Sequence, residues 1–141
     1  MQQSLTFLTL GVKNLEAMKN WYCNSFGWKT LKDENGIVFF KLNGIILGLY
    51  PATELAEDIG IRENGSGFKR FSMAINCFSE EEVDEQFEIL RKKNVNVVRE
   101  PEKVFWGGYR GYVSDPEENY WEIAYNPFLK MDANGNVVAH S

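Results

Sequence analysis

The feature that most constrains this chain is an internal repeat. Two halves, residues 1–50 and 68–127, show the same predicted order of a strand, a helix and three further strands. The halves also share a register, in which residues 10–15 match 75–80 and residues 45–51 match 120–127. A half of about 50 residues is too short to bury a core of its own. We therefore expect an α+β fold in which two βαβββ repeats form curved mixed sheets that enclose a central cleft, with the helices on the outside.

The elements of each repeat follow from local signals. Apolar residues at helical spacing predict a helix that begins after Asn14 and ends at Gly27. A capping box of Ser79 and Glu82 opens a second helix, which ends near Asn94. The predicted strands are 4–11, 28–32, 37–42 and 45–50 in the first half and 68–77, 95–99 and a pair within 106–125 in the second, with turns at 33–36, 43–44 and 115–116 and a break at 100–101.

Two segments lie outside the repeats. Residues 51–67 begin with a proline and end in a polar, glycine-rich stretch, so they are predicted to be a linker with one or two helical turns around 55–59. Residues 128–141 form a tail that has a turn signal and few apolar residues. We expect one domain overall, made of the modules 1–50 and 68–127.

Composition and charge argue against several classes of protein. The 141 residues carry a net charge of −5 and no basic stripe, which argues against a nucleic-acid partner. No apolar run approaches the roughly 20 residues that span a bilayer, so we expect no membrane insertion. Cys23 and Cys77 do not make a disulfide framework, and we expect them to be reduced in a cytoplasmic protein.

Glu122 is the first candidate for a functional residue. It stands in the middle of an aromatic and apolar strand, where a carboxylate is costly to bury without a partner. Strand alternation places Tyr120, Glu122 and Ala124 on one face, and we expect Trp121, Ile123 and Tyr125 to face the helix. A solvated glutamate on an exposed strand is an equal interpretation of the local pattern.

Two stretches of the chain resemble a known family. LTLGVKNLEAMKNWYCNSFGW near the start and GYVSDPEENYWEIAYNP near the end, together with the repeat, resemble the vicinal oxygen chelate superfamily. That group includes glyoxalase I, bleomycin-resistance proteins, fosfomycin-resistance proteins and extradiol dioxygenases. The resemblance covers nearly the whole chain, and it implies the fold, the cleft and a homodimer. It does not imply one activity, because the superfamily uses one scaffold for many reactions.

The resemblance also implies metal-ligand positions in the first and last strand of each half. In this chain those positions hold Phe7, Gly48, Ser72 and Glu122. Only Glu122 is a good ligand, because phenylalanine and glycine have no donor side chain and a serine hydroxyl binds Zn²⁺, Ni²⁺ or Fe²⁺ poorly. We therefore expect no divalent metal and no other cofactor. A further departure is Glu118, at a turn position where the family usually has glycine, and glutamate costs about 1 kcal/mol there if the position needs a positive φ.

Three interpretations of such a cleft stay open. The first is a protein of the bleomycin-resistance type that binds a small planar or aromatic, often cationic, ligand. The second is a metal-independent lyase or isomerase, or a dioxygenase-like member, with Glu122 as general base. The third is a structural or regulatory module. The residues expected to line the cleft are Phe7, Phe39, Gly48, Ser72, Trp106, Tyr109, Arg110, Tyr120 and Glu122. Packing or a subunit interface is an alternative role for Trp106 and Tyr109. Arg110 is expected to be a counter-ion for Glu122 or for a ligand carboxylate, and a solvated surface position is an equal alternative.

Overall fold

The computed structural model describes residues 1–3 and 5–141, so the predicted strand start at Ser4 lies outside the described residues. Contacts divide the chain into two compact units, Met1–Gly67 and Phe68–Ser141. The first unit contains β1 (Phe7–Val12), α1 (Leu15–Ser25), β2 (Lys32–Glu34), β3 (Ile37–Lys41), β4 (Ile46–Pro51) and α2 (Ala52–Ile59). The second contains β5 (Met73–Asn76), α3 (Glu80–Lys92), β6 (Asn96–Lys103), β7 (Tyr109–Ser114), β8 (Tyr120–Tyr125), β9 (Leu129–Met131) and β10 (Val137–His140).

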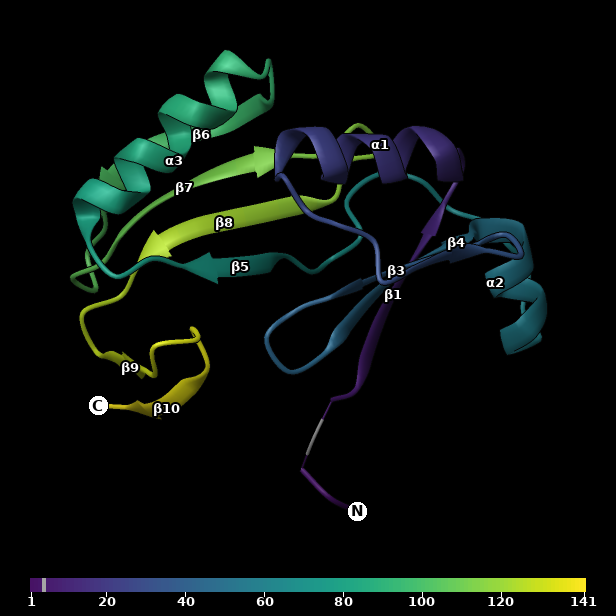
Figure 1. The fold of residues 1–141 in the computed structure, drawn as a ribbon, viewed down its shortest axis with the longest axis horizontal. Coiled ribbons are helices and arrows are strands. Elements are labelled where there is room, and N and C mark those ends of the chain that lie inside the picture. The colour runs from purple at the N-terminus through teal and green to yellow at the C-terminus, as the bar shows by residue number, and fades with distance from the viewer. Residues whose placement is uncertain (4) are drawn as a thin grey trace. The chain divides into compact units, whose positions relative to one another are not determined.

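The first unit is a four-stranded mixed sheet with α1 on one face (Figure 1). Its strand order is β1-β4-β3-β2, with β1 parallel to β4 and the other neighbours antiparallel. Asn14 caps α1 as predicted, because its side-chain oxygen accepts the backbone N–H of Ala17 at 3.0 Å. The buried ring of Tyr22 lies 5.9 Å from that of Phe40 in β3, which identifies the face that α1 covers. The side chains that form the core on this face are Leu10, Val12, Met18, Tyr22, Val38, Phe40, Leu47 and Leu49.

The second strand of this unit lies later than predicted. The predicted strand 28–32 was wrong, because β2 covers Lys32–Glu34 and the turn is only Asn35-Gly36, with φ of 56° and 73°. Trp28 leaves the sheet because its ring packs at the end of α1, stacked on Tyr22 with 5.7 Å between ring centres and edge-on to Phe26 with 5.1 Å between ring centres. Packing against these aromatic rings therefore keeps Trp28 out of the strand that the local pattern predicted.

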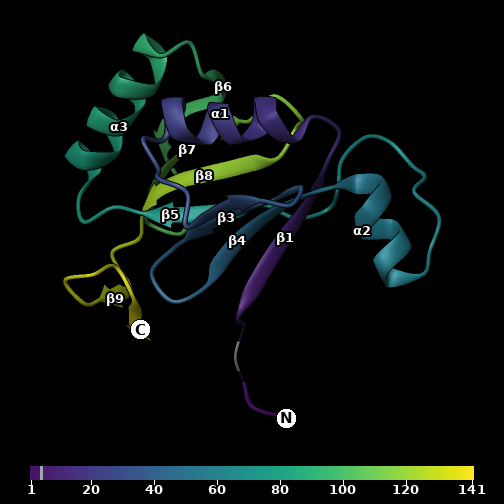
Figure 2. The same ribbon diagram turned by 45° about the vertical axis from the view of Figure 1, so that its right-hand side comes forward.

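The segment after β4 contains a full helix, α2, where one or two turns around 55–59 were predicted. It starts directly after Pro51 and ends at Gly60, whose φ of 88° terminates it. A Cβ built on Gly11 of β1 would lie 3.3 Å from both Ala52 and Leu55, so α2 packs closely on β1 (Figure 2).

The second unit repeats this arrangement. Its sheet has the order β5-β8-β7-β6, with β5 parallel to β8, and α3 covers one face (Figure 1). The predicted capping box is present, because Ser79 Oγ accepts the N–H of Glu82 at 3.0 Å and the Glu82 carboxylate accepts the N–H of Phe78 at 2.7 Å. Its core includes the buried side chains Val83, Phe87, Leu90, Val113, Trp121 and Ile123.

Two strand boundaries in this unit differ from the prediction. The predicted strand 68–77 shortens to β5, because Arg70 adopts a φ of 66°, a left-handed conformation that interrupts an extended strand. Next to it, Lys69 Nζ donates to Asn119 Oδ1 and to the carbonyl of Glu117, each at 3.0 Å. In contrast, β6 continues through the predicted break at 100–101 to Lys103, with register shifts on both sides of Arg99. Irregular pairing lets a strand accept the proline there, since that residue has no N–H to donate.

The tail is ordered as a hairpin of β9 and β10. Its loop, Asp132–Asn136, repeats the hydrogen bonds of the β7–β8 loop, Asp115–Asn119. In each loop the aspartate side chain accepts two backbone N–H groups at 2.9 Å and the side-chain amide of the final asparagine at 2.8–3.0 Å.

These observations confirm the predicted α+β class and the two βαβββ repeats, each of which forms a four-stranded mixed sheet. Among the described residues, no helix combines the length and the apolar character needed to cross a lipid bilayer.

Candidate functional site

Glu122 lies on the face of the second sheet that points away from α3. A Cβ built on Gly111 would lie 2.4 Å from the ring of Phe87 in α3, so Gly111 and its cross-strand partner Ile123 face the helix. Alternation then places the neighbouring residues on the opposite face, as the sequence predicted for Glu122. This face, called the Glu122 face below, carries Ala74, Arg110, Tyr112, Tyr120, Glu122 and Ala124.

The Glu122 carboxylate has a partner that the sequence analysis missed. Tyr112 lies directly opposite it in β7, and the phenol hydroxyl donates a hydrogen bond to Glu122 Oε2 at 2.7 Å. This hydrogen bond, together with burial, raises the pKa of Tyr112 above its ordinary value, so the phenol keeps its proton as a donor. The hairpin could have revealed the pair, because a turn closed at Asp115 and Asn119 sets Tyr112 opposite Glu122.

Arg110 stands beside this pair. Its guanidinium carbon lies 5.8 Å from the centre of the Tyr112 ring, and its Nη1 lies 3.3 Å from Glu102 Oε1. Arg99 also donates to that same oxygen at 2.8 Å. Arg99, and to a lesser extent Arg110, hold the pKa of the Glu102 carboxyl below its ordinary value, so this acid stays ionised between the two cations.

Other predicted site residues of this unit are not brought together with Glu122. Tyr109 lies on the α3 side, where its hydroxyl donates to Asp84 at 2.6 Å, and this bond raises the pKa of Tyr109 to about 12. Trp106 lies in the β6–β7 loop with its ring against Gly108. Ser72 is exposed just before β5. Tyr120 does share the Glu122 face, and its ring lies 6.5 Å from that of Phe68.

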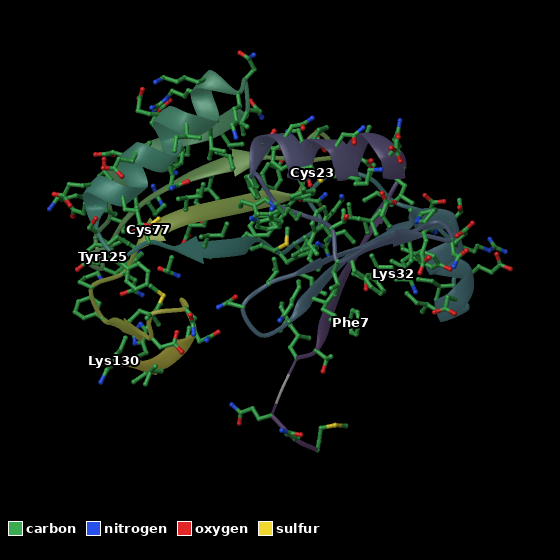
Figure 3. The ribbon with its side chains drawn as sticks, in the orientation of Figure 1. Phe7, Cys23, Lys32, Cys77, Tyr125 and Lys130 are labelled. Atoms are coloured by element: carbon green, nitrogen blue, oxygen red, sulfur yellow. The ribbon has the colours of Figure 1, made fainter. Side chains whose placement is uncertain are left out.

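The predicted residues of the first unit gather on one face of its sheet. Alternation from Phe40 places Phe7, Thr9, Phe39 and Gly48 on the face away from α1, called the Gly48 face below, and Figure 3 shows Phe7 on that side. The rings of Phe7 and Phe39 are 5.3 Å apart and tilted by 60°. A Cβ on Gly48 would lie 3.2 Å from Thr9 Oγ1 and 3.5 Å from the Phe39 ring, so this face is aromatic and closely packed.

The two faces are equivalent by register. Gly48 pairs with Thr9 and Phe39, and Glu122 pairs with Ala74 and Tyr112 at the same places in the second sheet. The Glu122–Tyr112 pair therefore corresponds to Gly48 and Phe39. The repeat keeps the backbone of this row and changes its chemistry.

Comparison with known proteins now identifies the family. The model of the Glyoxalase/Bleomycin resistance protein/Dioxygenase superfamily matches residues 4–123. The chain belongs to this superfamily.

Solved structures of the superfamily share the fold. A glyoxalase-related enzyme from Fulvimarina pelagi is 33% identical with a TM-score of 0.87, and the match covers 99% of this chain and 100% of that one. A glyoxalase/bleomycin resistance protein/dioxygenase from Nocardioides is 25% identical with a TM-score of 0.78, over 89% of this chain and 84% of that one. A lactoylglutathione lyase from Agrobacterium tumefaciens, at 22% identity and a TM-score of 0.73 over 89% and 96%, is similar in fold.

The side chains of these two rows are, apart from Glu122, poor ligands for a transition metal. In the second unit Glu122 is joined by a phenol, and at the equivalent row the first unit offers only the hydroxyl of Thr9 as a side-chain donor. Neutral hydroxyls are weak ligands for Zn²⁺ or Fe²⁺ compared with imidazole, thiolate and carboxylate. Within the described part of the chain, no three His, Cys, Asp or Glu residues are grouped so that they could hold an ion.

Proposed function

We propose that this superfamily member binds a small planar or aromatic molecule, without a metal ion, and that Glu122 makes the main polar contact with it. The observation that carries the proposal is the Tyr112–Glu122 hydrogen bond of 2.7 Å on the sheet face away from α3. The bond occupies one oxygen of Glu122 and fixes the carboxylate, while its other oxygen keeps acceptor sites for an N–H or O–H group of a ligand.

Aromatic residues support a planar ligand. On the Glu122 face, the half-buried Tyr112 and Tyr120 offer ring surface on which a planar molecule can stack. An acidic acceptor beside aromatic rings matches a planar molecule that carries a cationic or hydrogen-bond-donating group.

Thermal-shift screening with planar cations and aromatic amines tests this proposal. A ligand at 100 times its Kd should add about 2.7 kcal/mol to the free energy of unfolding. Glu122→Gln should weaken binding at least tenfold, because a charge-assisted hydrogen bond contributes about 1.5–3 kcal/mol. Glu85→Gln, the same chemical change on the exposed surface of α3, serves as the matched control. A screen without hits, or hits that Glu122→Gln leaves unchanged, would favour the structural or regulatory module instead.

Metal analysis of the purified protein tests the metal-free part of the proposal. We expect no stoichiometric divalent ion after purification without chelator. A stoichiometric ion that is lost on Glu122→Ala would show that the donor set assembles a metal site after all.

A second candidate is a metal-independent lyase or isomerase with Glu122 as general base. The same Tyr112–Glu122 pair favours it, since it places a protonated phenol beside the base and could return a proton to the product. Turnover that depends on pH through one acidic group and is abolished by Glu122→Gln would support this activity. Binding without turnover, across the compounds that raise the melting temperature, would support the first proposal alone.

We also propose that the protein is a cytoplasmic homodimer whose partner molecules are small ligands and not nucleic acids. Exposed aromatic side chains such as Phe68, Phe78 and Phe105 provide apolar surface for self-association. Cys23 and Cys77 are both free thiols, which suits a reducing compartment. Light scattering during gel filtration should give twice the mass of the chain, and a monomer at high concentration would contradict the dimer.

A further inference from the structure

Arg110 carries more hydrogen-bond donors than the described residues around it use. Its side chain is only 14% exposed, and among the described residues its one hydrogen bond is the 3.3 Å contact with Glu102. A guanidinium has several N–H donors in a fixed plane, and burying them without acceptors is costly. The remaining donors of Arg110 are therefore expected to reach either an acceptor or solvent.

The acid that forms an ion pair with Arg110 in the described part of the chain is shared. Glu102 accepts from Arg99 at 2.8 Å, a shorter contact than the one from Arg110, and its carboxylate is half-exposed. Two guanidinium groups thus share one carboxylate, and Arg110 makes the longer of the two contacts. Glu122 does not take the remaining donors of Arg110, because the hydrogen bonds of the described residues join its carboxylate to Tyr112 and not to Arg110.

The unused donors of Arg110 reach solvent. Among the described residues, no buried side-chain nitrogen or oxygen lacks a hydrogen-bond partner. The unpaired nitrogens of Arg110 must therefore belong to its small exposed part. Because Arg110 and Tyr112 are two residues apart in β7, these donors lie on the Glu122 face, where the Tyr112 ring supports the guanidinium from 5.8 Å.

From this geometry we propose that the ligand of the Glu122 face is a planar carboxylate, and that Arg110 takes its carboxylate group through paired N–H donors. The proposal rests on the function proposed above and narrows its ligand class. Arginine suits this task because its planar fork matches the two oxygens of a carboxylate. Glu122, two residues from the Arg110 partner Ala124, then accepts an N–H or O–H group elsewhere on the same molecule. The ligand would thus carry an acid at one end and a hydrogen-bond donor at the other.

Matched pairs of probes test the assignment. The panel consists of 4-aminobenzoate, indole-3-carboxylate and 2-naphthoate, each with its neutral carboxamide, and 4-aminobenzamidine as the planar cation. Binding to the full chain is measured by ligand-observed NMR and by calorimetry. We expect the acids to bind at least tenfold more tightly than their amides, because charge-assisted hydrogen bonds exceed neutral ones.

Variants connect any preference to Arg110. Arg110→Gln should abolish the preference for acid over amide, and Arg110→Lys should retain part of it. Arg99→Gln, which removes the other guanidinium on Glu102, should leave the preference intact. If Arg110→Gln does not fold, Arg110→Lys and the acid-to-amide ratio of the wild type still decide the matter.

The outcomes separate the two proposals. Amides or 4-aminobenzamidine that bind as well as the acids would overturn the carboxylate assignment and leave the proposed function standing. An acid preference that survives Arg110→Gln would also overturn it. No binding by any probe would count against both proposals.

Discussion

Replacing Glu118 by glycine should stabilise this protein. Glu118 is the fourth residue of the Asp115–Asn119 loop and adopts a φ of 63°, a left-handed conformation that L-residues avoid. The loop Asp132–Asn136 makes the same hydrogen bonds and has Gly135, with a φ of 80°, at the same place. One chain thus contains two versions of one turn, with and without a Cβ at the strained position.

The size of the effect follows from two opposed terms. The left-handed conformation costs an L-residue about 1–2 kcal/mol. Glycine avoids this cost, but it also stabilises the unfolded state by about 0.4–1 kcal/mol, because an unfolded chain with glycine is more flexible. The difference is a gain of about 0.5–1 kcal/mol in the free energy of unfolding. For a chain of this size, 1 kcal/mol raises the melting temperature by roughly 2–4 °C, so Glu118→Gly should raise it by about 1–4 °C.

Urea denaturation of Glu118→Gly, Glu118→Ala and the wild type tests the reasoning. Glu118→Ala removes the exposed carboxylate but keeps Cβ, so it should stay within about 0.5 kcal/mol of the wild type. Gly135→Ala should destabilise by about 1 kcal/mol from backbone strain alone, since a Cβ there meets no atom within 4 Å. Equal gains for the glycine and alanine variants of Glu118 would show that charge, and not backbone strain, sets the effect.

Three further predictions concern packing and titration. Gly111→Ala should lower the free energy of unfolding, measured in urea, by about 1–3 kcal/mol, because the new Cβ would lie 2.4 Å from the buried Phe87 ring. Gly48→Ala should cost under about 1 kcal/mol, since Thr9 Oγ1, at 3.2 Å from the new Cβ, can turn away. Similar losses for both variants would contradict this account. Burial raises the pKa of Cys77 to about 12, so Ellman's reagent at pH 8 should give one fast thiol, which Cys23→Ser removes; two fast thiols would contradict it. The hydrogen bond to Asp84 raises the pKa of Tyr109 from 10.0 to about 12, so its stabilising contribution is fully present below pH 10 and is lost as pH rises towards 12. The stability difference between wild type and Tyr109→Phe should therefore shrink over that range in urea titrations, and a constant difference would refute the assignment.

The fold could be predicted because its signals are local. Asn14, Ser79 and Glu82 begin their helices through contacts within one turn, and the repeat supplies the order of the strands. The errors arise where distant contacts decide. Trp28 packs on the end of α1, and the backbone turns at Arg70, next to Lys69, whose side chain binds the loop after β7.

The candidate site was predictable only in part, for a similar reason. Glu122 is recognisable as an acid in an apolar strand, but its partner Tyr112 is defined by cross-strand register. Tyr109 has the same composition cues as Tyr112 and lies on the opposite face, one residue out of phase. Because side chains alternate between the two faces of a strand, a shift of one residue moves a side chain from the Glu122 face to the α3 side.

The equivalence of the Gly48 and Glu122 rows leads to a test by transplantation. These rows face away from α1 and α3, so their side chains can change while the core under those two helices remains. Gly48→Glu alone should destabilise strongly, because the new side chain meets Thr9 at 3.2 Å and the carboxylate has only Phe39 opposite it. Adding Thr9→Ala and Phe39→Tyr reproduces Ala74 and Tyr112 of the second unit, and should recover much of the loss. Urea denaturation measures the recovery. Ultraviolet titration should reveal a further tyrosine whose pKa is raised by the neighbouring carboxylate, as the pKa of Tyr112 is raised by Glu122. A triple variant no more stable than Gly48→Glu would mean that the two sheets share strand order but not the local geometry that the Tyr112–Glu122 pair requires.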